Sequence, residues 1–203
     1  MVDHVEVLVE EPSMEVALRE LLPRIIGDMS FQIYPFQSKQ DLLGKLSNRL
    51  KGYSSWLPEN YRVVVIVDRD NDDCVVLKTS LEQAASEAGL ITRSRSVTPT
   101  YQVVNRIAIE ELEAWFFGDW HAVCEAYPKM NPYIRSKQPF RHSDQIAGGT
   151  WEALQRLLQR AGYYKAGMPK IETAQTIAKC MNPDRNQSQS FQCLRAALVE
   201  MTS

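Results

Sequence analysis

Five short strand segments are predicted in the first 120 residues of the chain; longer amphipathic segments separate the first four, and the turn-like Thr98-Pro99-Thr100 separates the last two. Residues 62–67, Arg-Val-Val-Val-Ile-Val, are apolar on both faces, which is typical of a central parallel strand covered by helices on both sides. The alternation of strands with helices predicts one mainly parallel sheet, in which residues 5–9 and 63–67 are neighbours. The predicted strands cover residues 5–9, 31–36, 62–67, 90–97 and 103–109.

Segments in which apolar residues recur with helical spacing lie between the predicted strands. After about residue 120 the strand pattern disappears and only helical segments are predicted. The first helices are predicted over residues 13–26, 38–50 and 74–88, and the later ones over residues 151–161, 171–180 and 190–201. Pro128, Pro132 and Pro139 interrupt the region between the two groups. The predicted fold class is α/β, with a mainly parallel sheet flanked by helices over residues 1–120. Residues 121–203 are predicted to be a C-terminal helical extension, either packed on the first domain or separate from it.

The composition is that of an ordinary globular protein, with 203 residues of which 44% are hydrophobic. There is no apolar run of about 18 residues, and residues 1–11 carry acids where a signal peptide has basic residues. We therefore expect a cytoplasmic protein without a membrane partner. The four cysteines are far apart and form no CxxC pair, which argues against a zinc site or a disulfide framework.

The net charge of -2 conceals an uneven distribution along the chain. Residues 1–128 hold 20 acids and 12 bases, whereas residues 129–195 hold 4 acids and 11 bases. A metal site needs acidic residues, and a polyanion such as DNA or RNA needs basic ones, although the basic residues are equally consistent with solvated helix faces.

Acidic residues follow three of the predicted strands. In an open α/β sheet, ligands bind outside the carboxyl ends of the strands, where loops from several strands converge. Crowded carboxylates repel one another unless protons or cations relieve the repulsion, and their hard oxygen atoms suit Mg²⁺ or Mn²⁺. The acids at these ends are Glu10, Asp68, Asp70, Asp72, Glu111 and Glu113.

Each acidic element also has a plain structural explanation. A single Glu at a strand end is often just exposed, and an Asp-rich loop is often a turn with Asx caps. Glu110, Glu111 and Glu113 are also consistent with the acidic first turn of a helix. A calcium loop is disfavoured because Gly is missing at its sixth position and residues 74–77 are apolar. The occurrence of all three elements in strand order favours a shared site.

The order of these acids resembles the Glu and Asp-x-Asp signature of the TOPRIM domain, which occurs in topoisomerases, primases, recombination proteins and OLD nucleases. More closely, four segments are similar to a prokaryotic family grouped with TOPRIM-like and RloB-like proteins: Val9-Glu10-Glu11-Pro12-Ser13, Val67-Asp68-Arg69-Asp70, Asp73-Cys74 and Glu111-Leu112-Glu113-Ala114-Trp115. The similarity extends to Gly148-Gly149-Thr150-Trp151-Glu152 and Tyr164-Lys165, so it spans most of the chain. One departure is Glu11, where the common TOPRIM pattern has Gly.

The resemblance implies a TOPRIM-like fold and Mg²⁺- or Mn²⁺-dependent phosphoryl chemistry on nucleic acid. Glu10 would bind metal or help to deprotonate an attacking water, and Asp68 and Asp70 would bind one or two ions. A cation near the transition-state charge is also expected, and Lys165 is assigned to it, with Arg141 and Lys39 as alternatives. The candidate metal ligands are Glu10, Glu11, Asp68, Asp70, Asp72, Glu111 and Glu113.

The spacing of the last acids leaves two pairings open. If residues 110–113 are extended, Glu111 and Glu113 lie on one side, whereas on a helix Glu110 and Glu113 face together.

The leading functional hypothesis is a divalent-metal-dependent nuclease or related phosphodiester-cleaving protein. The alternative is a non-catalytic TOPRIM-like binding or regulatory module, and a third reading is an enzyme acting on small phosphoesters. The partners considered are DNA or RNA bound through residues 129–195, a protein partner and a homodimer.

Overall fold

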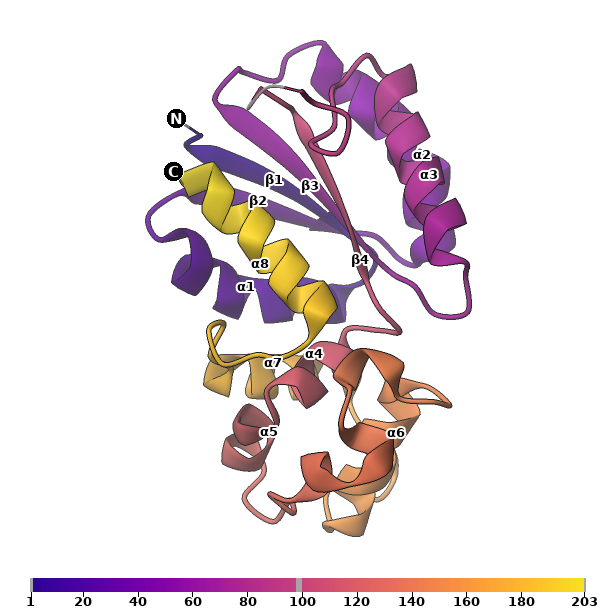
Figure 1. Cartoon of the computed structure of the whole chain (residues 1–203), viewed down its shortest axis with the longest axis vertical. Coiled ribbons are helices and arrows are strands. Elements are labelled where there is room, and N and C mark those ends of the chain that lie inside the picture. The colour runs from indigo at the N-terminus through magenta and orange to yellow at the C-terminus, as the bar shows by residue number, and fades with distance from the viewer. Residues whose placement is uncertain (1, 98–99, 203) are drawn as a thin grey trace.

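The computed structural model describes residues 2–97 and 100–202, which contain a four-stranded, all-parallel sheet (Figure 1). The strand order is β2-β1-β3-β4, so the first and third strands are neighbours, with Val9 aligned with Ile66. The predicted α/β class and the predicted pairing of these two strands are therefore confirmed. The strands are β1 (His4–Val9), β2 (Ser30–Pro35), β3 (Tyr61–Asp68) and β4 (Val103–Ala108).

Helices cover both faces of the sheet. Helices α2 (Lys39–Ser54) and α3 (Cys74–Glu87) lie on one face, and α1 (Pro12–Ile26) and α8 (Gln189–Thr202) lie on the other (Figure 1). Alternate residues of β3 serve the two layers: Val63, Val65 and Val67 belong to the cluster under α2 and α3, and Val64 and Ile66 to the cluster under α1 and α8. The continuous apolar run of β3 is thus explained by its two-sided burial.

A helical region lies beyond the carboxyl ends of the strands, below the sheet in Figure 1. It comprises α4 (Glu113–Gly118), α5 (Trp120–Ala126), α6 (Thr150–Arg160) and α7 (Lys170–Cys180), with three short 3-10 turns between α5 and α6. The chain then returns to the sheet as α8, which contacts both β4 and α1. Within the described ranges, no helix has the length and apolar character that would let it pass through a membrane.

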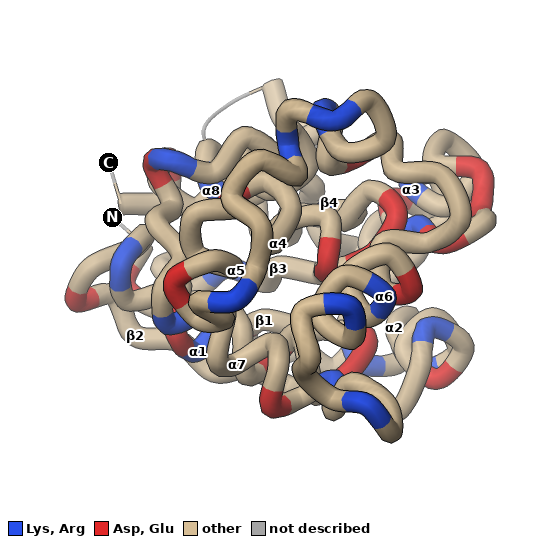
Figure 2. The backbone as a smooth tube through the Cα atoms, turned by 90° about the horizontal axis from the view of Figure 1, so that it is seen from below, with Lys and Arg blue, Asp and Glu red and all other residues tan. Residues whose placement is uncertain are grey.

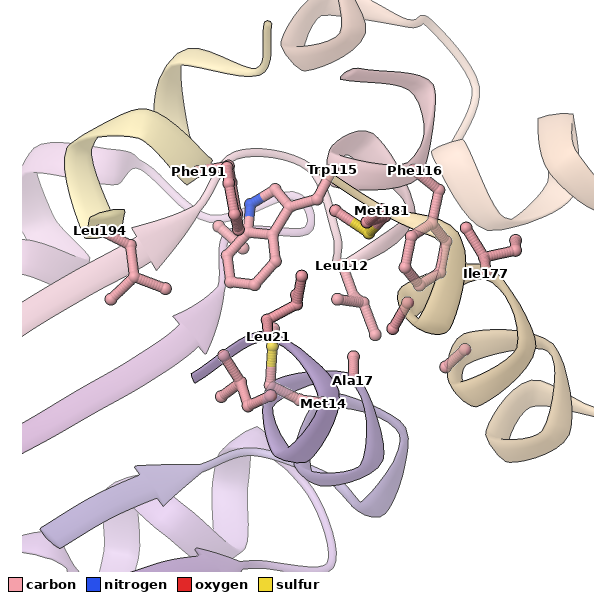
Figure 3. Close-up of a cluster of buried hydrophobic side chains, with 14 of the residues drawn as sticks. Met14, Ala17, Leu21, Leu112, Trp115, Phe116, Ile177, Met181, Phe191 and Leu194 are labelled. Atoms are coloured by element: carbon pink, nitrogen blue, oxygen red, sulfur yellow. The ribbon is translucent and has the colours of Figure 1, made fainter. Parts of the chain in front are cut away.

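One apolar core joins the helical region to the sheet. Figure 3 shows Trp115 of α4 lying between Leu21 of α1 and Phe191 of α8, with Phe116 directed toward Ile177 of α7. The rings of Trp115 and Phe191 meet edge to face, with centroids 5.3 Å apart. The Trp115 indole N–H donates a hydrogen bond of 3.1 Å to the Ser190 hydroxyl, so its polar atom is satisfied inside the core.

The strand predicted over residues 90–97 is wrong. This segment forms only one isolated bridge to the sheet, between Thr92 and Val103. The hydroxyls of Thr92 and Ser94 donate to the Glu82 carboxylate on α3, and the amides of Arg95 and Ser96 donate to the Thr92 carbonyl. These local hydrogen bonds turn the chain away from an extended course, as Ser and Thr side chains commonly do.

Glu82 is the point that attaches this segment to α3. Besides the two hydroxyls, its carboxylate accepts a hydrogen bond of 3.0 Å from the Asn105 amide and pairs with Lys78 at 2.9 Å. Burial alone would raise the pKa of Glu82, but these hydrogen bonds outweigh it and lower the pKa to about 2. The ionised form is therefore strongly favoured in the folded protein.

We predict that Glu82→Gln lowers the free energy of unfolding by about 2–3 kcal/mol at pH 7, because it removes charge-assisted hydrogen bonds from buried groups. Since the folded pKa lies below the unfolded one, this stability is present above the unfolded pKa and is lost as pH falls toward 2. Urea denaturation at pH 7 and pH 3 should therefore show a smaller difference at the lower pH. Glu87→Gln, an exposed change on the same helix, is the control, and equal losses in the two variants would contradict the prediction.

Candidate functional site

The predicted acids are found where β1, β3 and β4 end. Glu10 directly follows β1, Asp68 is the last residue of β3, and Glu113 begins α4 shortly after β4. Since the strands are parallel and adjacent, their carboxyl ends share one edge of the sheet. At this edge Asp68 and Glu113 are buried, whereas Asp70 and Asp72 stay partly exposed.

Asp68 and Glu113 are buried acids, with 3% and 1% of their surfaces exposed. Burial raises the pKa of Asp68 well above its usual range, and the nearby charges of Glu10 and Glu113 add to the effect. Burial also raises the pKa of Glu113 to about 8, against the opposing charge of Lys170. Protons or cations are therefore needed to keep this pair in place at neutral pH.

Glu10 connects the ends of β1 and β3. Its carboxylate accepts a hydrogen bond of 3.1 Å from the Asp68 backbone N–H. Burial nevertheless raises the pKa of Glu10, and repulsion from Asp70 contributes in the same direction. The hydrogen bond fixes Glu10 next to Asp68 without neutralising either charge.

Two oxygen atoms of the buried acids have no hydrogen-bond partner among the described residues: Asp68 Oδ1 and Glu113 Oε2. Buried carboxylate oxygens without a donor are uncommon and indicate an absent partner or a functional role. In their present positions, the described side chains contain no group of three or more His, Cys, Asp or Glu that could hold a metal ion.

Two lysines compensate part of the negative charge. Lys39 Nζ lies 2.6 Å from Asp70 and 2.9 Å from Asp72, and Lys170 Nζ lies 2.6 Å from Glu11. Burial lowers the pKa of each lysine, but the acids outweigh it, and both pKa values are raised. Both are therefore firmly charged.

Lys39 and Lys170 share an unusual position, because each is the first residue of its helix, α2 or α7. The positive end of the helix dipole disfavours a cation there. A lysine at the start of a helix therefore needs an acidic partner, and the three acids Asp70, Asp72 and Glu11 supply it. This was the signal in the sequence by which Lys170, not assigned to the site, could have been found.

The chain turns sharply after β3 and β4. Asp70 and Glu110 have φ values of 49° and 63°, in the left-handed region, and the Asp70 amide donates to the Glu110 carbonyl at 2.8 Å. Such backbone is costly for residues with a side chain and is concentrated at functional sites. The turn at Glu110 joins the end of β4 to the two glutamates that follow it, Glu111 and Glu113.

A pocket of about 450 Å³ opens beside this turn. Asp70, Glu110, Glu111 and Glu152 line it together with Asn71 and the pair Gly148-Gly149. Glu111 accepts hydrogen bonds from the Thr150 hydroxyl at 2.9 Å and the Trp151 amide at 2.8 Å, so it caps the start of α6. The pocket is strongly acidic, and two of its lining residues, Asp70 and Glu111, are each two positions along the chain from a buried acid.

The predicted site residues therefore fall into three groups. Glu10, Asp68 and Glu113 form the inner cluster, and Glu11, Asp70 and Asp72 pair with lysines around it. Glu111 caps α6 instead of joining Glu113. Lys165 is exposed in the loop between α6 and α7 and forms no ion pair with any described acid, whereas Lys39 and Lys170 do.

Some basic residues of the helical region form ion pairs, and others have no ion-pair partner among the described residues. Arg185 pairs with Asp119 at 2.7 Å, and Arg195 pairs with Asp184. Arg156, Arg160 and Lys165 are exposed and form no ion pair within the described part of the chain. Figure 2 shows that basic and acidic segments alternate on this side of the molecule instead of separating into two fields.

We predict that Glu113→Gln stabilises the metal-free protein at alkaline pH. The folded pKa of about 8 lies above the unfolded value, so the stability of the protonated form is present below the unfolded pKa and is lost as pH rises through 8. In the presence of a chelator, the free energy of unfolding of the variant, relative to that of wild type, should increase by about 1.4 kcal/mol per pH unit between pH 5 and pH 8. Urea denaturation measures it, with the exposed change Glu59→Gln as control. Parallel pH profiles for Glu113→Gln and wild type would contradict this assignment.

Comparison with known proteins gives one match. The model of a family described as a domain of unknown function, DUF4276, matches residues 9–199. Neither the curated proteins nor the solved structures contain a match to the chain. The matched range includes Glu10, Asp68, Glu113, Lys39 and Lys170, and it extends through the helical region into α8. The chain therefore belongs to the DUF4276 family.

Proposed function

We propose that this protein cleaves phosphodiester bonds in nucleic acid with the help of Mg²⁺ or Mn²⁺ bound at Glu10, Asp68 and Glu113. The observation that carries the proposal is the pair of buried carboxylates, Asp68 and Glu113, each with an oxygen that lacks a partner. Desolvating two charges beside each other costs several kcal/mol per ion unless an opposite charge lies between them. A divalent cation supplies that charge, and oxygen is the ligand that Mg²⁺ and Mn²⁺ prefer.

The donor set fits such an ion in chemistry. Asp68 Oδ1 and Glu113 Oε2 would be the first ligands, because no hydrogen bond has to be broken to release them. Glu10 would be the third, at the cost of its hydrogen bond to the Asp68 amide. When bound, the ion supplies charge stabilisation for the phosphoryl oxygens and lowers the pKa of a water bound to it.

The remaining residues have roles that follow from their positions. Glu10 has a raised pKa, which makes its carboxylate a better proton acceptor near neutral pH than an ordinary glutamate. Lys39 holds Asp70 and Asp72, and Lys170 holds Glu11, so both lysines keep the loops around the cluster in place. The resemblance to TOPRIM-like nucleases supports the same assignment of Glu10, Asp68 and Asp70.

The position of α6 and the cations on it support nucleic acid as the substrate. The start of this helix borders the acidic pocket, and the unpaired cations Arg156 and Arg160 lie further along it, with Lys165 in the following loop. A phosphate backbone that follows these cations would lead toward the acids at the strand ends.

A non-catalytic module of the same fold is the second candidate. The observation that favours it is that Lys39 and Lys170 already compensate three acids around the cluster. In that case the lysines would complete the charge balance and the fold would serve for binding alone.

We predict that Mn²⁺ stabilises the protein by mass action, by about 2.7 kcal/mol when its concentration is 100 times the Kd. For a domain of this size that is a rise in Tm of roughly 5–11 °C. Asp68→Asn should abolish the rise and also stabilise the metal-free protein, because it removes a buried charge. Asp28→Asn, an exposed change outside the site, should keep the full response. Differential scanning calorimetry with and without chelator measures the response. An unchanged response in Asp68→Asn would place the ion elsewhere.

Cleavage is expected to require both the inner cluster and a divalent ion. Glu10→Gln should lower the cleavage rate of single- or double-stranded DNA or RNA at least about 100-fold, since general-base groups contribute on this scale. Its binding affinity for the same substrate should be retained. Binding without cleavage under either Mg²⁺ or Mn²⁺ would favour the non-catalytic module.

The substrate path can be tested separately by the salt dependence of binding. Replacing Arg156, Arg160 and Lys165 together by Ala should reduce the slope of log affinity against log salt by about 2–3, which corresponds to three phosphate contacts. Lys179→Ala, which removes an exposed cation from α7, is the control. An unchanged slope in the triple variant would exclude α6 as the path.

A further inference from the structure

A second pocket lies at the free edge of the sheet, along β4. It has a volume of about 740 Å³, which lies within the range typical of small-molecule sites. Helices α3 and α8 both contact β4 and lie on opposite faces of the sheet (Figure 1). Residues of both helices line the pocket. We call it the β4 pocket, and its residues are distinct from those of the acidic pocket near Gly149.

Four cations line the β4 pocket, against a single acid, Asp144. Three of the four have an acidic partner: Arg69 pairs with Glu110, Lys78 with Glu82, and Arg93 with Glu200. The fourth, Arg106, forms no ion pair with any residue that the structure describes. The pocket therefore contains one guanidinium without an ion-pair partner among the described residues.

Arg106 is held by the backbone alone. Its guanidinium donates to the carbonyl of Cys193 at 3.1 Å and to the carbonyl of Asn105 at 2.9 Å. Burial lowers the pKa of Arg106, and repulsion from Arg93 contributes. Lys78 donates to the same Asn105 carbonyl at 2.7 Å, so the two cations lie close together. An anion at this point would relieve their repulsion.

The rest of the lining combines apolar side chains with four polar ones, Asn105, Gln145, Gln189 and Ser190. Ile107 and Ile109 contribute side chains from β4 and the residue after it, and Ala196 and Ala197 contribute from α8. The small side chains on α8 leave room for a flat group beside the strand. A bare inorganic ion would not fill this volume, and an uncharged molecule would leave Arg106 without a counter-charge.

We propose that the β4 pocket binds a small organic phosphate of nucleotide size, with its phosphate at Arg106 and Lys78 and its apolar body against Ile107, Ile109 and Ala196. This combination of an anionic head and an apolar body follows from the lining residues. The inference is independent of the proposed metal site. Arg69 is the one residue that belongs both to the Asp68-Arg69-Asp70 loop and to this pocket, so an occupant would contact the loop through Arg69.

The exposed Cys193 provides a direct readout, because it lines the pocket. AMP is used as the probe on the full chain, and alkylation of Cys193 by iodoacetamide is followed by mass spectrometry. AMP should slow this alkylation at least several-fold, whereas adenosine or inorganic phosphate alone should give little protection. Alkylation of Cys124, which lies outside the β4 pocket, serves as the internal control.

Two variants test whether AMP protects Cys193 by binding in the β4 pocket. Arg106→Gln should weaken AMP binding by about 10- to 100-fold, the loss expected for charged hydrogen bonds. Ala196→Trp, at an exposed position, should block the apolar part without touching Arg106, and it remains informative if Arg106→Gln fails to fold. Arg195→Gln, the neighbouring residue on α8 outside the pocket, should bind AMP like wild type. Absence of protection by AMP, equal protection by inorganic phosphate, or unchanged binding in Ala196→Trp would overturn the proposal.

Discussion

The parallel pairing of β1 with β3 is the constraint on which the rest of this molecule depends. Its register aligns Val9 with Ile66, so the chain leaves β1 at Glu10 directly beside the Asp68 amide. Because helices cover both faces of these strands and the helical region covers their ends, Asp68 and Glu113 are desolvated as soon as the fold is complete. The raised pKa values of Asp68 and Glu113 follow from this burial.

The sheet could be predicted because its information is local in the sequence. The apolar run of β3 and the alternation of strands with helices are patterns that burial on both faces requires. Residues 90–97 show where such patterns fail: only Leu90, Ile91 and Val97 are apolar there, and Thr92 and Ser94 donate hydrogen bonds to a buried carboxylate on α3. Side-chain hydrogen bonds to a residue in another element leave no periodic trace in a sequence.

The acids of the site could be predicted from the sequence, but their arrangement in space could not. Glu111 and Glu113 are two residues apart, yet Glu111 lies before α4 and caps α6, whereas Glu113 is the first residue of α4 and is buried near Asp68. Lys170 lies far from the acids in sequence and reaches Glu11 only through the packing of α7 on α1. Which acid has which partner is decided by this tertiary packing, and a single sequence does not encode it in any short-range pattern.

The return of α8 to the sheet has a consequence for how the chain acquires its structure. The layer that α1 begins at Pro12 is completed only by residues 189–202, so contacts across it span almost the whole sequence. Such a high contact order makes folding slow, since a long loop must close before these contacts form. While the chain is being synthesised, the apolar faces of α1 and β4 stay uncovered until α8 has left the ribosome. During that interval the surface that α8 later covers stays exposed, and exposed apolar surface favours aggregation.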